Sequence, residues 1–159
     1  MPEPANTAPN TGSTIILSLV ENKCESFTLT PEALKVTAPL AFDQYEFKFT
    51  ISVNFNQTTR HARVNAGVKL REKRDNADGI ELAELKSVQL FLVENFSEII
   101  QFDPHGQLII PNELVQLFHQ VALSTARGMY SIKLQDTIFS NAVLPLIHPD
   151  AFLQAPASI

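Results

Sequence analysis

The sequence has very little of the residues from which disulfides and zinc sites are built. It contains one cysteine, Cys24, and no tryptophan in 159 residues. A lone cysteine cannot form an internal disulfide or supply the cysteine set of a structural zinc site. Of the aromatic residues, 11 are phenylalanine and two are tyrosine. Because phenylalanine adds apolar area without a hydrogen-bonding group, the composition indicates an extensive apolar surface that something must cover.

Positive charge is also scarce. Lys and Arg number 12 against 17 Asp and Glu, which gives a net charge of −5. Nucleic-acid binding depends on basic clusters that neutralise phosphates, so we do not expect nucleic acid as the main partner. The apolar runs are far shorter than the roughly 20 residues of a membrane span, and no signal peptide is evident. The sequence therefore predicts a cytoplasmic protein without membrane insertion.

Motifs for catalysis and for cofactor binding are missing as well. None of the four histidines lies in an HExxH pattern, and there is no GxGxxG or GxxxxGK loop for phosphates. Ser124 with His119 lacks the sharp turn and the orienting carboxylate of a nucleophilic site. We therefore expect no enzymatic activity, no metal and no cofactor.

The clearest pattern that is present runs from Tyr45 to Phe55. Every odd position there is apolar and every even position is polar. A strict period of two predicts a β-strand, because successive side chains of a strand point to opposite faces. This strand should have one aromatic face and one polar face.

Three other segments, 14–29, 60–71 and 85–96, are also predicted to be strands. Charged residues interrupt the apolar face of the first segment at 21–25, which predicts a bulge or a frayed stretch there. Residues 72–84 are rich in charge and are expected to form a loop. Short turns between consecutive strands favour an antiparallel sheet.

A long helix is predicted after the strands. Between residues 114 and 131, one helical face is predicted from residues that recur every three or four positions, namely Leu114, Leu117, Phe118, Val121, Thr125 and Met129. Residues 150–153 are expected to begin a last helical turn. Residues 1–13 hold three prolines and no periodicity, and are expected to be a disordered tail.

This order predicts an α+β fold. We expect one domain at 14–159, built from a four-stranded antiparallel sheet with a long helix and a short C-terminal helical element on one face.

The C-terminal half resembles a known family. Pro111-Asn112-Glu113-Leu114 through Ala126-Arg127-Gly128, then Leu-Pro-Leu-Ile-His-Pro-Asp-Ala-Phe at 144–152, is similar to the end of the SecB-type export chaperones. The order of the strands is similar too, so that the resemblance spans about residues 14–153. It implies a SecB-like fold, a dimer of dimers, and apolar grooves that bind unfolded preproteins and pass them to SecA without a cofactor or a reaction.

The resemblance also implies which residues bind clients. In SecB-like proteins the crossover between the first two strands and the second helix frame the client groove. Leu40 and Phe42 lie in the expected crossover, and Ile147 and Phe152 lie in the C-terminal segment. These four are the candidate client-binding residues.

Three functions remain open at this point. The first is a SecB-type holdase, diverged from the general export factor because 60–74 is basic where the family is acidic. The second is an adaptor or scaffold of the same fold that binds one dedicated partner. The third is a hotdog-type thioesterase or a binder of a small apolar ligand. A hotdog enzyme is disfavoured because the helix at 114–131 contains no Asp or Glu.

Overall fold

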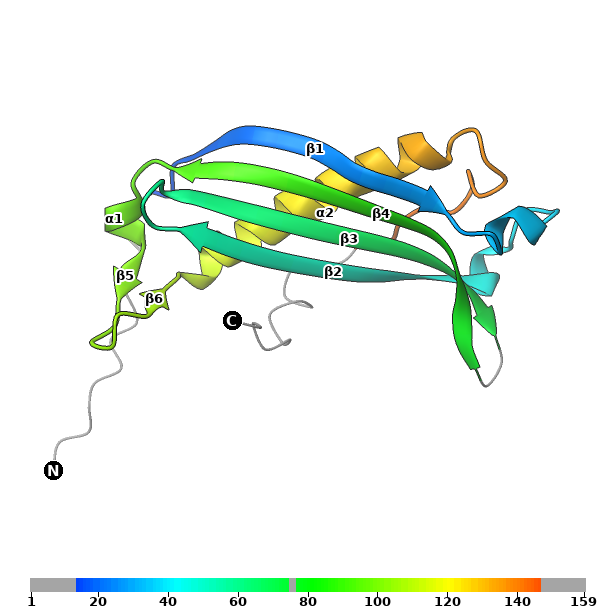
Figure 1. The fold of residues 1–159 in the computed structure, drawn as a ribbon, viewed down its shortest axis with the longest axis horizontal. Helices are drawn as coiled ribbons and strands as arrows, with labels where there is room; N and C mark the ends of the chain where they lie inside the picture. Colours follow the sequence, from blue (N-terminus) through cyan, green and yellow to red (C-terminus); the bar gives the residue numbers. More distant parts are fainter. Residues whose placement is uncertain (1–13, 75–76, 147–159) are drawn as a thin grey trace, which may run out of the picture.

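A computed structural model of the protein describes residues 14–74 and 77–146 (Figure 1). Its main sheet has four antiparallel strands in the order β1-β4-β3-β2. The strands are β1 (Leu17–Leu29), β2 (Tyr45–Asn56), β3 (His61–Arg74) and β4 (Ala77–Val93). The remaining elements are the 3₁₀ helices η1 (Ala33–Lys35) and η2 (Phe42–Gln44), the short helix α1 (Phe96–Ile99), the small β5–β6 hairpin (Gln101–Phe102 and Leu108–Ile109) and the long helix α2 (Asn112–Leu134). The predicted tail at 1–13 and the predicted last turn at 150–153 lie outside the described residues.

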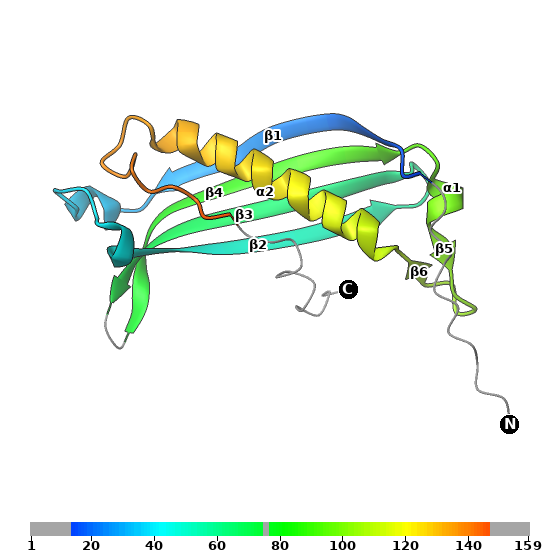
Figure 2. The same ribbon diagram turned by 180° about the vertical axis from the view of Figure 1, so that it is seen from behind.

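Helix α2 crosses one face of the sheet diagonally. The strands lie in front of the helix in Figure 1 and behind it in Figure 2. The sheet face beneath α2 includes alternate residues of β3, which are buried as the period of two predicts. These are Ala62, Val64, Ala66, Val68 and Leu70. None of the helices in the described part of the chain is long and apolar enough to cross a membrane.

The helix is longer than predicted, and its buried face is rotated from the predicted one. The sequence pattern placed Leu117, Val121 and Met129 beside Leu114 and Phe118 on the inner face. The fully or almost fully buried residues of α2 are instead Leu114, Phe118, Ala122, Ala126, Tyr130 and Leu134. The arc of apolar residues is wide, so periodicity shows that a helix forms but does not select the row that faces the sheet.

The first strand contains the predicted irregularity. The β1–β4 ladder shifts register between Leu19 and Glu21 and again between Cys24 and Ser26. A bulge bends and twists a strand locally. The strand can therefore carry its charged segment without losing its pairing to β4.

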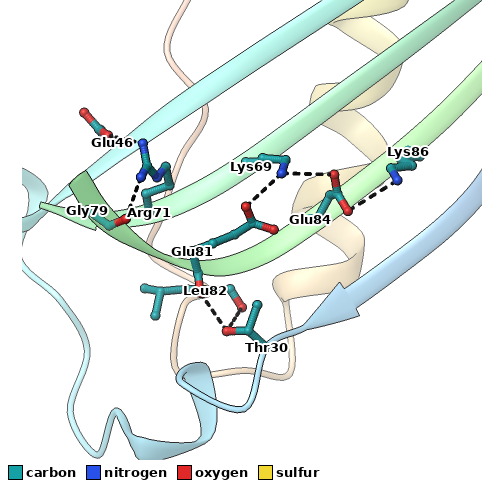
Figure 3. Close-up of polar contacts among 9 residues, drawn as sticks. All are labelled: Thr30, Glu46, Lys69, Arg71, Gly79, Glu81, Leu82, Glu84 and Lys86. Carbon is teal, nitrogen blue, oxygen red and sulfur yellow. Dashed lines mark hydrogen bonds and ion pairs between the residues drawn. The ribbon is translucent and has the colours of Figure 1, made fainter.

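The prediction of a charged loop at 72–84 was wrong, because β3 and β4 continue into a longer hairpin. Arg71 donates from Nη2 to the Gly79 carbonyl oxygen at 2.6 Å across this hairpin (Figure 3). A Cβ on Gly79 would lie 2.3 Å from the Glu72 carbonyl oxygen, so only glycine permits this approach of the two backbones. Leu82 is fully buried. Glu81 and Glu84 of this hairpin pair with Lys69 on the neighbouring strand, so these charges do not prevent strand formation.

Candidate functional site

A row of aromatic rings extends from the crossover along β2. Phe42, Tyr45, Phe47 and Phe49 follow one another with ring centroids 5.8, 5.6 and 6.3 Å apart. The last three share a face because alternate residues of a strand do so, and η2 brings Phe42 into line with them. The first two contacts are edge-on, an arrangement that aromatic pairs prefer. These four residues are named the aromatic row.

Of the aromatic row, only the residue at its crossover end is largely exposed. Tyr45 is buried, Phe47 and Phe49 are partly buried, and Phe42 is 79% exposed. Full burial of a phenylalanine side chain is worth about 1.5–3 kcal/mol, most of which Phe42 does not gain. A single exposed apolar residue needs no explanation, but this one continues a row of rings. The row therefore ends in apolar area that a bound polypeptide can cover.

The chain after α2 returns to the same end of the sheet. Asn141 donates from Nδ2 to the Leu40 carbonyl oxygen at 3.2 Å, and the Tyr45 hydroxyl donates to the Asn141 carbonyl oxygen at 3.5 Å. Arg127 on α2 donates from Nη2 to the Pro145 carbonyl oxygen at 2.9 Å. Figure 2 shows this segment on the same face of the sheet as the helix. Asn141 thus lies next to the crossover, and the chain runs from there alongside α2 to the position of Arg127.

The returning segment alternates between buried and exposed apolar side chains. Ala142 and Leu144 are buried, whereas Val143 is 62% and Leu146 is 88% exposed. The buried pair anchors the segment in the core, and the exposed pair adds apolar area on the same face of the sheet as α2. The aromatic row and residues 141–146 are together named the candidate binding surface.

Arg127 is expected to hold this segment in place. In an Arg127→Met variant the apolar stem is kept, but the bond to Pro145 is lost. A hydrogen bond from a charged group is worth about 1.5–3 kcal/mol, and the loss is partly offset because Arg127 Nε is buried without a hydrogen-bond partner. We expect a loss of stability of about 1 kcal/mol and faster amide exchange at 141–146, measured by hydrogen-exchange mass spectrometry. Lys133→Met, an exposed site on the same helix, is the control; equal exchange in both variants would contradict this role.

Strand β2 is the more open of the two sheet edges. Within the described part of the chain, no strand pairs with its outer side. Its ladder with β3 keeps one register over all 12 residues. The opposite edge, β1, has two register shifts and carries Glu21, Lys23 and Glu25. Because bulges and charges block pairing at an edge, an extended polypeptide can pair with β2 more readily than with β1.

Two of the four predicted client-binding residues lie in the described structure. Leu40 is partly buried against the core, and its carbonyl oxygen accepts the Asn141 hydrogen bond. Phe42 is exposed at the end of the aromatic row. Ile147 and Phe152 lie outside the described residues, so all four roles stay predictions. Sequence reasoning missed that Phe42 continues the aromatic face of β2, although it lies only three positions before that strand.

The residues considered for chemistry are not arranged as a site. His119 is buried on α2, whereas Ser124 is exposed on the same helix. In residues 14–74 and 77–146 no group of three or more His, Cys, Asp or Glu side chains could hold a metal ion.

Comparison with solved structures identifies the fold. The chain is similar to a SecB-like chaperone of Mycobacterium tuberculosis, Rv1957, solved in complex with a ChAD peptide from the Rv1956 HigA1 antitoxin. The match covers 82% of this chain and 90% of that chain, with a TM-score of 0.50 and 13% sequence identity. This chain has a SecB-like fold. The α+β fold predicted from the sequence, a four-stranded antiparallel sheet with a long helix, is confirmed.

A second solved structure is only weakly similar to this chain. A protein of unknown function from Streptococcus agalactiae matches over 77% of this chain and 90% of that chain, at 11% identity and a TM-score of only 0.29. No family model matches this chain, and no curated protein matches its sequence.

Proposed function

We propose that this protein is a holdase chaperone that binds unfolded or preprotein polypeptides through the candidate binding surface. The observation that carries the proposal is Phe42, which is 79% exposed at the end of the aromatic row. The row lies on an edge strand whose register is unbroken. Binding needs no cofactor and no catalytic residue. The proposed site of action is the cytoplasm, where the protein would serve clients before export.

The surface would bind many sequences because the two interactions that hold a client, apolar burial and main-chain hydrogen bonding, depend little on the client's sequence. Burial of apolar client side chains against the aromatic row is non-directional. Main-chain hydrogen bonds to the outer edge of β2 are the same for every residue except proline. Unfolded chains offer both apolar side chains and unpaired backbone, whereas folded proteins hide them. Selectivity for the unfolded state follows without recognition of a particular motif.

Self-association belongs to the proposal. Ile16, Leu19 and Val20 are large hydrophobic residues at or next to the N-terminal end of β1, and each is about half exposed. Burying such side chains between copies favours an oligomer. A dimer of dimers would present several copies of the candidate binding surface to one client. Linked weak sites hold a long chain more tightly than one site does, and SecA is the proposed receiver of exported clients.

The alternative is an adaptor of the same fold with one dedicated partner. The Mycobacterium tuberculosis protein was solved with a peptide from one antitoxin, which favours a polypeptide ligand in either case. A holdase binds unrelated unfolded chains, whereas an adaptor ignores them. The two proposals therefore differ in breadth of binding and can be separated by using clients that have no common sequence.

The proposal predicts that Phe42→Ser abolishes most of the protein's ability to suppress aggregation. Serine removes the exposed ring at the end of the aromatic row, and the apolar contact with a client is lost. The measurement is light scattering of two unrelated denatured proteins diluted into buffer with the wild type or the variant. We expect suppression by the wild type and at least about a fivefold weaker effect of Phe42→Ser, corresponding to about 1 kcal/mol of lost contact.

Phe102→Ser is the matched control for this assay. Phe102 is 51% exposed on β5, at the other end of the molecule from η2 (Figure 1). The Phe102→Ser variant loses the same kind of side chain but leaves the aromatic row intact, so it should still suppress aggregation. Oligomeric mass, measured by chromatography with light scattering, must be equal in both variants. Equal loss in both variants would count against the candidate binding surface, and no suppression by the wild type would favour the adaptor.

A further inference from the structure

Charged residues on the sheet face opposite α2 form a compact paired set. Lys69 Nζ lies 2.8 Å from Glu81 Oε2 and 3.5 Å from Glu84 Oε1, and Glu84 also contacts Lys86 Nζ at 3.5 Å (Figure 3). Lys69 alternates along β3 with residues buried beneath the helix, so its side chain lies on the other face. Hydrogen bonding to Glu81 raises the pKa of Lys69, which keeps the ammonium group charged. Lys69 and Lys86, at the centre of this face, therefore each have a carboxylate partner.

Lys48 is the exception. It stands directly opposite Lys69 in the β2–β3 ladder. Within residues 14–74 and 77–146 it forms no ion pair. Two like charges directly opposite each other destabilise a sheet, and a glutamate or a neutral residue at this position would remove the repulsion. Features that break a local rule without a structural gain are expected at functional positions.

A hollow lies beside Lys48 because Gly67 has no side chain. Gly67 pairs with Thr50 on one side and with Lys86 on the other. A Cβ at this position would lie 2.5 Å from Thr50 Oγ1. The hollow has a volume of about 310 Å³, and its lining includes lysines from three strands, namely Lys48, Lys69 and Lys86. The register of the sheet thus gathers three ammonium groups and a hydroxyl around one open position.

The charges around the hollow do not balance. Glu81 and Glu84 offset two of the three lysines. Glu25 also lines the hollow, but it is paired with Arg63 at 3.0 Å. One positive charge, that of Lys48, is left without a counter-ion from the described residues. A single carboxylate in the hollow would supply it, and charge-assisted hydrogen bonds from ammonium groups to carboxylates are among the stronger ones.

We propose that this hollow binds the carboxylate of an acidic side chain on a partner polypeptide. The charges on the face around it are largely paired, which resembles the polar rim of a protein interface. The hollow accepts one side chain, and the polar side chains around it contact the polypeptide that carries it. The site is on the opposite face from the candidate binding surface, so a client and this acidic partner can bind at the same time.

The test uses a short fluorescent oligoglutamate peptide as the probe and fluorescence anisotropy at low ionic strength as the readout. The wild type should bind the peptide. Lys48→Gln should raise the dissociation constant about three- to fivefold, as expected for the loss of one partly exposed ion pair. Lys73→Gln, farther along β3 and outside the hollow, makes the same charge change and should leave affinity unchanged. Gly67→Ala, which fills the hollow, should also weaken binding.

Several results would overturn the proposal. Equal weakening by Lys48→Gln and Lys73→Gln would show a net-charge effect without a site. Absence of wild-type binding would also refute it, as would equal competition by inorganic phosphate or tighter binding of duplex DNA. Lys48→Gln removes a like-charge repulsion, so its thermal unfolding midpoint should not fall below that of the wild type. Its suppression of aggregation should be unchanged, which separates this test from that of the proposed function.

Discussion

Replacing Phe118 with alanine is expected to lower the free energy of unfolding by about 3–5 kcal/mol. Phe118 is fully buried on α2, and its ring centroid lies 5.1 Å from that of Phe91 and 5.8 Å from that of Phe55. It joins the helix to β4 and β2 at once. Truncation removes both ring contacts and leaves a cavity that the rigid sheet cannot fill. The loss is a large part of the about 5–15 kcal/mol that stabilises a typical domain.

Urea denaturation followed by circular dichroism measures this loss. Phe102→Ala is the control, because Phe102 is half exposed on the small β5–β6 hairpin. It should change stability by less than about 1 kcal/mol. If the two variants were equally stable, Phe118 would not be the connection between helix and sheet that the ring contacts indicate.

Raising the pH above about 10 is expected to destabilise the protein through Tyr130. Tyr130 is fully buried, with its ring against Phe27 and Phe47. Burial raises the pKa of its hydroxyl above the ordinary value. The folded protein therefore holds this proton more strongly than the unfolded chain. The stabilisation is complete below the ordinary pKa and is lost as the pH rises from there, by up to about 1.4 kcal/mol per pH unit.

Comparison with Tyr130→Phe isolates this effect from the titration of lysines. Phenylalanine keeps the ring in the core and removes the ionisable group. Unfolding free energies of both proteins, measured in urea from pH 8 to the alkaline limit of folding, should diverge above about pH 10, with the wild type falling faster. Parallel curves over that range would mean that the Tyr130 hydroxyl ionises as easily in the folded protein as in the unfolded chain.

The sheet could be predicted from the sequence because side chains of a strand alternate between two faces, which produces a period of two in the sequence. The alternation at 45–55 and 60–71 placed the buried faces of β2 and β3 correctly. The hairpin at 72–84 was missed because single-residue polarity says nothing about pairing. Only the structure shows that Arg71 reaches across to Gly79. Similarly, the position of Tyr130 on the inner face of α2 depends on packing against Phe47, which periodicity does not contain.

The candidate binding surface was only partly accessible to sequence reasoning. Phe42 was selected through a resemblance, and its exposure and its alignment with Tyr45 come from the turn of η2. The approach of Asn141 to the crossover depends on its bond to Leu40, which is 101 positions away in the sequence. Contacts over such separations leave no local pattern in a sequence.

The pairing of β1 with β4 has a consequence during synthesis on the ribosome. Leu17 pairs with Val93, so β1 cannot complete its pairing until β2, β3 and β4 have all been translated. At about 5–20 residues per second this interval lasts several seconds. Throughout that time β1 is an unpaired strand among other nascent chains. The bulges of β1 and its charged residues Glu21, Lys23 and Glu25 disfavour pairing with other chains during this time. Strand β2, in contrast, can pair with β3 almost as soon as both have been synthesised.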